Sequence, residues 1–424
     1  MKLTAKLNNK IWLLLLFLLS MIHPILLVGF FVWLIIDSTK STFKGIQALN
    51  LIAIRTILNP AIAVNTSSVQ LIKWATIFII CFRILYSAKG ERYPKKVSQS
   101  IFCVTFFCFY ICLVSLVNSS YPVVSIFKCI SYGFVFCSVL VGISSLKNKV
   151  DIADELFTYL TVLMFGCILF APFSFSYYSS ASWFMGLTNQ SQMFGIMAAL
   201  YAALLIYQIT KGKRTLFIYF MIFMVTALTF MSGSRTGMIS TIICIIYGLY
   251  IEIVKNKRAW LLLIAVAILM VIGVFYGHTI SEAFRTFILK DYTGTASYDV
   301  TLGNISLSRK GQYEMFLTKF QNNRFLGSGF MVPFESGVQS WSFSLTILVE
   351  SGNLFYAVLG DLGFIGLGIF LLCYGMIFFK GDKTKGKTVL FLAPLLICMG
   401  EMVFFSTNNN AIILYTMIAA YLVG

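Results

Sequence analysis

Long apolar runs recur along almost the whole of this 424-residue chain, and they leave few folds open to it. Runs of ~18 or more apolar residues are long enough to cross a lipid bilayer as helices. Only 11% of the residues are charged, whereas soluble domains have about 25%. Because a helix in lipid satisfies its own backbone hydrogen bonds, the sequence predicts an all-α, polytopic transmembrane helix bundle, with residues 1–424 as one integral-membrane domain.

The N-terminal region is less regular than the rest. Residues 11–36 form either one long span or a tight hairpin broken at His23-Pro24, and residues 46–64 form a short or broken helix. Keeping the N-terminus and Lys95 on one side requires an even number of early crossings, which gives about twelve spans in total, with roughly eleven to fourteen allowed. The clearer spans are expected at residues 69–88, 99–117, 121–142, 156–176, 189–209, 215–232, 236–254, 259–277, 354–379, 388–406 and 411–423.

Lysines before Ile11 imitate a signal peptide. The apolar run continues to Ile36 without a small-residue cleavage site after Ser20, so we expect a retained anchor.

Most of the net charge of +17 sits in short clusters between the spans, near residues 89–96, 147–149, 211–214, 255–258 and 380–387. Alternating the spans places all of these clusters on one side, which the positive-inside rule identifies as the cytoplasm. The charge therefore indicates membrane topology and not nucleic-acid binding.

One long polar stretch, residues 278–345, interrupts the apolar pattern and falls on the opposite, extracytoplasmic side. Loops longer than ~15 residues are uncommon and usually functional. Ser308 is a candidate cap for a helix that starts at Arg309. An apolar stripe follows at helical spacing, which predicts a short amphipathic helix over the outer mouth of the bundle. The stripe consists of Tyr313, Phe316, Leu317 and Phe320.

The Ser232-Gly-Ser234-Arg235 turn lies between two spans on the same outer side. Arg235 either reaches out to lipid headgroups or clamps an anion, with the small residues Ser232 and Ser234 allowing the backbone to come close. Both interpretations remain open at the level of the residues.

Further outward cations are Arg285, Arg309 and Arg324. Arg309 would lie in the first turn of the loop helix, where the helix field already attracts anions. Each arginine alone fits a solvated charged face. Together they predict an electropositive patch suited to a lipid pyrophosphate.

Glu350 closes the polar loop just before the next span. A partly desolvated carboxylate there can act as a general base, or it can be an ordinary interfacial acid. Asn189 opens another span from the outer side, where its amide either binds sugar hydroxyls or simply starts the helix.

Other motifs argue against cofactor and metal chemistry. Residues 381–388 match the phosphate-loop pattern but join two membrane spans, without the strand that the motif requires. The ten cysteines fall in predicted spans, and two histidines give little basis for a metal site. We therefore expect neither a cofactor nor a metal.

Several motifs follow a fixed order along residues 186–370: Thr188-Asn189-Gln190, Ser232-Gly-Ser-Arg235, Ser308-Arg309, Asn323-Arg-Phe-Leu-Gly327-Ser-Gly329, Asn353 and Gly360-Asp-Leu-Gly363-Phe-Ile-Gly366. This order resembles the O-antigen ligase and polymerase (Wzy-type) superfamily of polysaccharide polymerases. The resemblance implies metal-independent glycosyl transfer on the outer face of the bacterial plasma membrane. It also implies a polyprenyl-pyrophosphate-linked oligosaccharide as substrate, with membrane lipid and a chain-length regulator protein among the partners.

The family's pyrophosphate-binding arginines would correspond to Arg235 and Arg309. Ligases of the family carry a His-Asn pair near the end of the loop, where this chain has Gly352-Asn353. The missing histidine argues for a polymerase rather than a ligase, with Glu350 as the substitute base and Asn353 as a substrate contact.

Three alternatives remain beside the polymerase. An O-antigen ligase-type glycan transferase shares the motifs. A lipid-linked oligosaccharide flippase would show related halves and buried charges in place of one dominant outer loop. A polymerase of the shape, elongation and division type is similar in span number, but its pattern is not found here.

Overall fold

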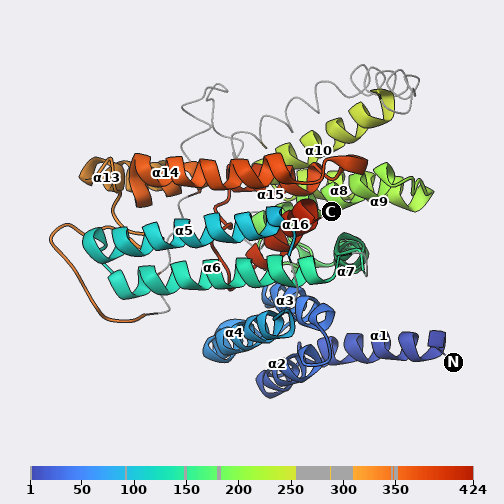
Figure 1. Cartoon of the computed structure of the whole chain (residues 1–424). Coiled ribbons are helices and arrows are strands. Elements are labelled where there is room, and N and C mark those ends of the chain that lie inside the picture. Colours follow the sequence, from blue (N-terminus) through green and yellow to red (C-terminus); the bar gives the residue numbers. More distant parts are fainter. Residues whose placement is uncertain are drawn as a thin grey trace.

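A computed structural model of the chain describes residues 2–90, 93–147, 150–178, 183–254, 287, 309–344, 347 and 352–423. These residues form a bundle of α-helices, with isolated bridges in place of strands (Figure 1). The helices are α1 (Lys2–Leu19), α2 (Pro24–Ser38), α3 (Thr42–Thr56), α4 (Gln70–Ser87), α5 (Lys95–Asn118), α6 (Pro122–Ser145), α7 (Ile152–Leu169), α8 (Ser191–Thr210), α9 (Leu216–Met231), α10 (Arg235–Val254), α13 (Lys310–Asn322), α14 (Leu354–Lys380), α15 (Val389–Cys398) and α16 (Ala411–Val423). Short 3-10 turns are η1 (Thr66–Val69), η2 (Ser174–Ser176) and η4 (Thr384–Gly386).

The bundle has the composition of a membrane protein. Within the described ranges, 7 helices are long and apolar enough to cross a bilayer, and four shorter apolar helices accompany them. Apolar side chains remain exposed on outward helix faces, such as Leu216 at 85% and Leu372 at 76% exposed, which suits contact with lipid. The expected all-α polytopic bundle is confirmed, while the count of about twelve spans stays a prediction.

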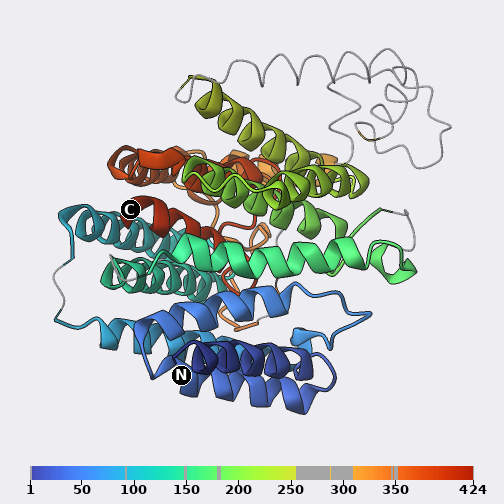
Figure 2. The ribbon, with the colours of Figure 1, turned by 90° about the vertical axis from the view of Figure 1, so that its right-hand side faces the viewer.

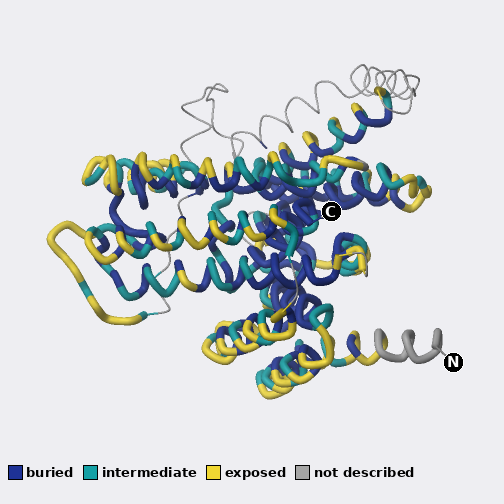
Figure 3. The backbone as a smooth tube through the Cα atoms, in the orientation of Figure 1, coloured by how far each residue is buried: buried dark blue, intermediate teal, exposed yellow. Residues whose placement is uncertain are grey.

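Helices α1–α4 form one edge of the bundle and α10 lies at the opposite edge, with α5 and α6 between them in both views (Figures 1 and 2). The order in space differs from the order in the sequence, because the C-terminal helix α16 packs against α3 and α6. Buried segments concentrate in the middle of the bundle, around α8 and α16 (Figure 3).

The N-terminal residues form a hairpin. Helix α1 ends before His23, and Pro24 starts α2 with its ring at the first helical position, where no N–H is needed. The Arg55 guanidinium is buried at the end of α3 and donates to the Ser20 carbonyl and the Val64 carbonyl, each at 2.8 Å. Arg55 therefore fixes the hairpin turn to the loop after α3, and residues 46–64 include the short helix that the sequence allowed.

The basic clusters that the structure describes gather at one end of the bundle. Lys147 and Lys387 line a common cavity, and Lys96 lies within electrostatic reach of both. Lys211 pairs with Asp151 at 2.9 Å at the same end. We call this the basic end, and the positive-inside rule predicts that it faces the cytoplasm.

The predicted loop helix is present as α13, with its apolar stripe packed against α14. The Phe316 and Tyr356 rings stack at 4.8 Å, and Phe320 meets Phe364 edge-on at 5.3 Å. The exposed chain that follows α13 arcs around the ends of α5 and α6 (Figures 1 and 3), where the Ser340 N–H donates to the Ser120 carbonyl at 2.7 Å. Residues 255–286 and 288–308, which include the predicted 259–277 span and the Ser308 cap, lie outside the described residues.

Helix α14 is broken at Gly363, whose φ of 66° interrupts the helical hydrogen bonds. The segment after α13 occupies this break. The N–H of Gly329 donates to the Asp361 carbonyl at 3.0 Å, and the N–H of Phe364 donates to the Arg324 carbonyl at 2.9 Å. Backbone groups freed inside a span must find partners within the protein. The glycine-rich motifs of the two segments therefore form one interlocked unit.

A buried ion pair holds the same unit. The Lys319 ammonium of α13 lies 2.5 Å from an Asp361 carboxylate oxygen, and both side chains are 2% exposed. The second carboxylate oxygen accepts the N–H of Met331 at 2.7 Å. Asp361 is costly inside a span unless it is paired, and α13 supplies the partner.

Two expected spans differ from the structure. Residues 354–379 do not form one straight helix: the Phe355 and Phe370 rings lie 6.4 Å apart, although a straight helix would separate these residues by ~22 Å. The expected 388–406 span was wrong at its end, since α15 stops at Cys398. The chain leaves the helix so that Gly400 can pack against Thr236, where an added Cβ would lie 1.9 Å from the threonine hydroxyl oxygen.

Replacing Gly363 by alanine is expected to lower the free energy of unfolding by about 2–4 kcal/mol, because the backbone conformation is strained for other residues. The added Cβ would also lie 2.2 Å from the Phe325 carbonyl oxygen. Thermal unfolding of the detergent-purified protein measures the change. Gly368→Ala is the matched control, since this glycine of the same helix has open space beside it. Equal unfolding temperatures for the two variants would contradict the interlock.

Candidate functional site

The Arg309 side chain joins four segments that are far apart in the sequence. Its Nη1 donates to the Gly352 carbonyl at 3.0 Å, and its Nη2 donates to a Glu401 carboxylate oxygen at 3.1 Å. The same nitrogen donates to the Thr236 hydroxyl at 3.5 Å. The Arg309 side chain is 34% exposed and that of Glu401 27%, so neither group is sealed off. Arg309 thus lies where the starts of α10, α13 and α14 meet the turn after α15.

The serine turn sets the direction of α10. Ser232 donates to the Thr229 carbonyl at 2.7 Å, and the Ser234 hydroxyl accepts the N–H of Gly237 at 3.3 Å as a helix cap. Both serine side chains are buried, so the structure gives them turn and capping roles, while contact with a substrate stays a prediction. The turn places Arg235 in the first turn of α10, directly before the threonine that Arg309 contacts.

Small residues of this turn also allow α8 and α10 to approach closely. A Cβ added to Gly195 of α8 would lie 2.1 Å from the Ser234 hydroxyl oxygen, and one added to Gly237 would lie 2.7 Å from the Gly195 Cα. Close backbone approach through small residues is a common way to pack membrane helices. The position of Arg235 is therefore fixed by tight helix packing beneath it.

The Gly352-Asn353 pair begins α14. Gly352 has a φ of 65°, and a Cβ there would lie 2.1 Å from the Gln312 amide oxygen. A histidine at this position would therefore require the Gln312 side chain to rotate away, and its backbone would be strained at this positive φ. The Asn353 amide oxygen caps α14, accepting backbone N–H groups at 2.9 and 3.2 Å, and its amide nitrogen donates to the Met399 carbonyl at 2.6 Å.

Glu401 is a site residue that sequence reasoning missed. It fell inside the expected 388–406 span, where an ionisable residue is by default a sign of function. Because α15 ends at Cys398, the carboxylate lies in a turn and reaches Arg309. The position of a lone acid inside an apolar run was the signal that could have identified it.

Within the described ranges, Asn189 and Arg324 make no contact with Arg309. Asn189 lies beside the loop after α3, with its N–H donating to the Ile57 carbonyl at 2.8 Å. Its amide oxygen is buried without a partner. Arg324 is exposed at the other end of α13 from Arg309. Arg285 and Glu350 lie outside the described residues.

The charges around Arg309 suit an anion. The first turn of a helix carries unpaired N–H groups and a positive field, and α10 begins there with Arg235. Glu401 neutralises part of this charge. A doubly charged diphosphate could displace that carboxylate and bind the guanidinium through two parallel hydrogen bonds.

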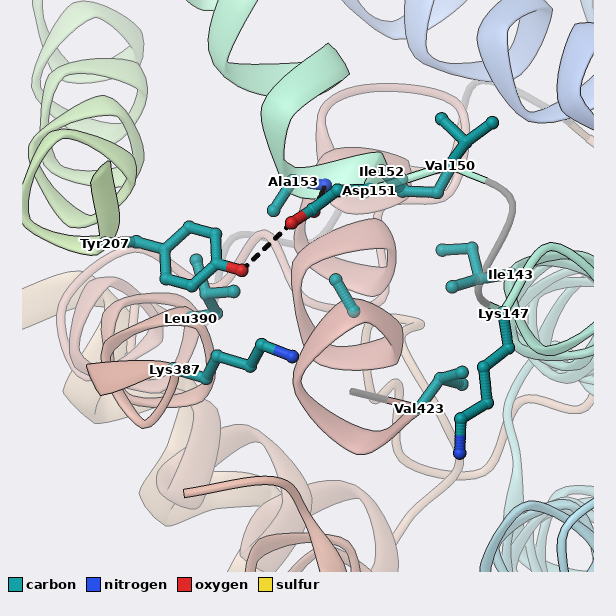
Figure 4. Close-up of a pocket in the computed structure, with 11 residues that line it drawn as sticks. Ile143, Lys147, Val150, Asp151, Ile152, Ala153, Tyr207, Lys387, Leu390 and Val423 are labelled. Atoms are coloured by element: carbon teal, nitrogen blue, oxygen red, sulfur yellow. Dashed lines mark hydrogen bonds between the residues drawn. The ribbon is translucent and has the colours of Figure 1, made fainter. Parts of the chain in front are cut away.

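A cavity of about 310 Å³ lies at the basic end and contains none of the residues around Arg309. Figure 4 shows Lys147 and Lys387 at its sides and the Tyr207 hydroxyl donating to Asp151. It is formed by the ends of α6, α8 and α16 and the starts of α7 and α15. The presence of a cavity of this volume therefore does not by itself identify the functional site.

Comparison with protein families gives one match. Residues 220–371 match the family model Wzy_C, described as O-antigen ligase. The search of curated proteins and the search of solved structures give no match. The matched range includes the serine turn, Arg309 and the interlocked α13–α14 unit, in agreement with the resemblance seen in the sequence. The chain therefore has the helices of a multi-pass membrane protein, and its residues 220–371 are similar to the O-antigen ligase (Wzy_C) family.

Proposed function

We propose that the chain is a polysaccharide polymerase that joins polyprenyl-pyrophosphate-linked oligosaccharides of O-antigen or capsule type. The reaction takes place at the end of the bundle opposite the basic end, on the outer face of the bacterial plasma membrane. The observation that carries the proposal is the contact of Arg309 with the first turn of α10, which Arg235 begins. The segment that carries Arg309 therefore meets the N-terminus of α10, which carries Arg235, at a position that solvent can reach.

The chemistry needs no metal in this proposal. A hydroxyl oxygen of the acceptor sugar attacks C1 of the donor sugar, and the bond between C1 and the diphosphate oxygen breaks. The polyprenyl diphosphate leaves with the bonding electrons, and the arginines stabilise the negative charge that develops on it. A base receives the proton of the attacking hydroxyl.

Two carboxylates are candidates for that base. Glu350 is the residue expected from the sequence. Glu401 is the candidate supported by geometry, since its carboxylate already lies 3.1 Å from the Arg309 guanidinium. When a diphosphate takes up the guanidinium, the ion pair between Arg309 and Glu401 is weakened, and the Glu401 carboxylate becomes a better proton acceptor.

The polymerase is favoured over the ligase by the Gly352 position. The chain has glycine where the family's ligases carry histidine, and the φ of 65° at Gly352 disfavours a side chain there, so this position supplies no ligase-like base. A flippase is less consistent with this site, because the arginine cluster lies at one end of the bundle and not along a path through it.

Reconstitution tests the function directly. Liposomes containing the purified protein and lipid-linked single repeat units from a polymerase-deletion strain should produce long glycan and free polyprenyl diphosphate, with no nucleotide or divalent metal added. In the same assay, Glu350→Gln or Glu401→Gln should lower kcat roughly 10²- to 10⁴-fold, according to which residue is the base. Transfer of the glycan to a lipid A acceptor would indicate a ligase. Movement of intact units between leaflets without bond formation would indicate a flippase.

A further inference from the structure

We propose that a cavity of about 90 Å³ between α4, α6 and the turn joining α15 to α16 binds a sugar of the lipid-linked substrate. This inference rests on the proposed function and names a subsite for it. We call it the Trp74 cavity. Its walls include Gln70, Trp74, Lys128, Ser406, Thr407 and Asn408.

The lining combines the two kinds of surface that a sugar presents. Trp74 and Phe127 meet edge-on with ring centroids 5.4 Å apart, which supplies an apolar wall. Hydroxyl and amide side chains of the turn after α15 lie on another wall. Binding sites commonly join aromatic walls with a few placed polar groups, and a pyranose ring has an apolar face and a polar rim.

One polar atom of the cavity wall lacks a partner in the described residues, and so do the amide atoms of Asn410, which lies two residues beyond the wall residue Asn408. The Trp74 side chain is 8% exposed, and its indole Nε1 has no hydrogen-bond partner in the described part of the chain. Asn410, which closes the same turn, is 0% exposed with both amide atoms unpaired. A buried donor without an acceptor is costly. The hydroxyl groups of a sugar in the cavity would accept from the indole and remove part of that cost.

The cavity is not built for a phosphate. Its one lysine, Lys128, donates to the Met331 carbonyl at 2.6 Å and to the Ile347 carbonyl at 2.9 Å. These bonds direct the ammonium to backbone carbonyls and hold the wall of the cavity in place. A neutral, hydroxyl-rich ligand fits this lining better than an anion does.

Two short chain segments connect the cavity to the arginine site. Ile347 and Ser406 line the cavity, while Gly352 and Glu401 bind Arg309. Ile347 is five residues from Gly352, and Ser406 is five residues from Glu401. A fully extended chain of five residues spans at most about 18 Å. A glycan whose diphosphate is bound at Arg309 can therefore reach the cavity with one of its other sugars.

The size of the cavity limits what it can hold. Sites for whole small ligands have volumes of roughly 300–1,000 Å³, so about 90 Å³ accommodates part of a single ring and not a repeat unit. Contacts with a sugar away from the reacting bond contribute to binding and recognition of the repeat unit, not to bond breaking. The cavity would thus select the substrate.

The test uses the full-length protein in liposomes with single lipid-linked repeat units from a polymerase-deletion strain. Trp74→Phe keeps the ring but removes the indole N–H, and Asn408→Ala removes an amide from the opposite wall. Each variant should raise the KM for the repeat unit roughly 10-fold at nearly unchanged kcat, since one ligand hydrogen bond is lost. Unfolding temperatures should stay at the wild-type value.

Trp33→Phe is the matched control, because Trp33 stacks on Phe30 within α2, away from the cavity. It should leave KM unchanged. An unchanged KM in both cavity variants would overturn the sugar subsite, as would a fall in kcat alone or a lowered unfolding temperature without a change in KM. If the wild-type protein forms no polymer from these units, the proposed function itself has failed, which is a separate result.

Discussion

Arg309→Ala is expected to lower polymer formation by roughly 10²- to 10³-fold, the loss typical when one stabilising donor is removed from a developing oxyanion. Arg309 brings together the start of α10, Gly352 and the Glu401 turn, so its removal leaves these three segments without their shared donor. Arg309→Lys retains the charge but loses the paired donors, and should recover part of the activity. Polymer length in the reconstituted system and in complemented deletion strains measures the effect.

Lys310→Ala is the control for the Arg309 variants. Lys310 is the next residue on the same helix, with a side chain 72% exposed and paired with Glu314 at 3.8 Å. It should keep wild-type polymerisation and membrane insertion, because exposed ion pairs contribute little. Wild-type polymer from Arg309→Ala, or an equal loss in Lys310→Ala, would remove the guanidinium from the proposed mechanism.

The second large effect is expected at the buried ion pair of Lys319 and Asp361. Removing one member leaves the other charged without a partner. This typically lowers the free energy of unfolding by about 3–5 kcal/mol, and we expect a similar loss for either single variant. Asp361→Leu also removes the acceptor of the Met331 N–H. We expect Lys319→Met and Asp361→Leu each to reduce the yield of folded, monodisperse protein in detergent and to lower its unfolding temperature sharply.

The double variant Lys319→Met with Asp361→Leu distinguishes a charge effect from a packing effect. With both charges gone, much of the loss should be recovered, since replacing a whole buried pair by apolar residues is often neutral. A double variant as unstable as the sum of the single variants would show that the ion pair is not the source of the effect. The unfolding temperatures of the wild type, the two single variants and the double variant together form a double-mutant cycle.

Apolar periodicity predicted most of the helices, because length and hydrophobicity decide which segments cross a bilayer. It did not reveal the break in α14 or the early end of α15. Both depend on distant partners: Arg324 and Gly329 pair with the break at Gly363, and Thr236 fills the space beside Gly400. Single-sequence patterns do not contain such contacts.

Prediction of the candidate site was uneven for a similar reason. The residue types at Arg235 and Arg309 indicated anion binding, and the structure brings their segments together. Ser232 and Ser234 have turn and capping roles, while their contact with a substrate stays a prediction. Glu401 was missed because it was assigned to a span, and the hydroxyl and amide groups beside Trp74 were missed because they come from three unconnected parts of the chain.

The interlock between the segment after α13 and the break in α14 also constrains the order of biogenesis. Residues 324–329 leave the ribosome before Gly363 does, so their partners do not yet exist when they emerge. When α14 then enters the bilayer, its broken turn exposes carbonyl and N–H groups that lipid does not satisfy. The outer segment must therefore close onto α14 after insertion, and maturation of the arginine site becomes a late step in assembly, since α13 carries Arg309 at its start.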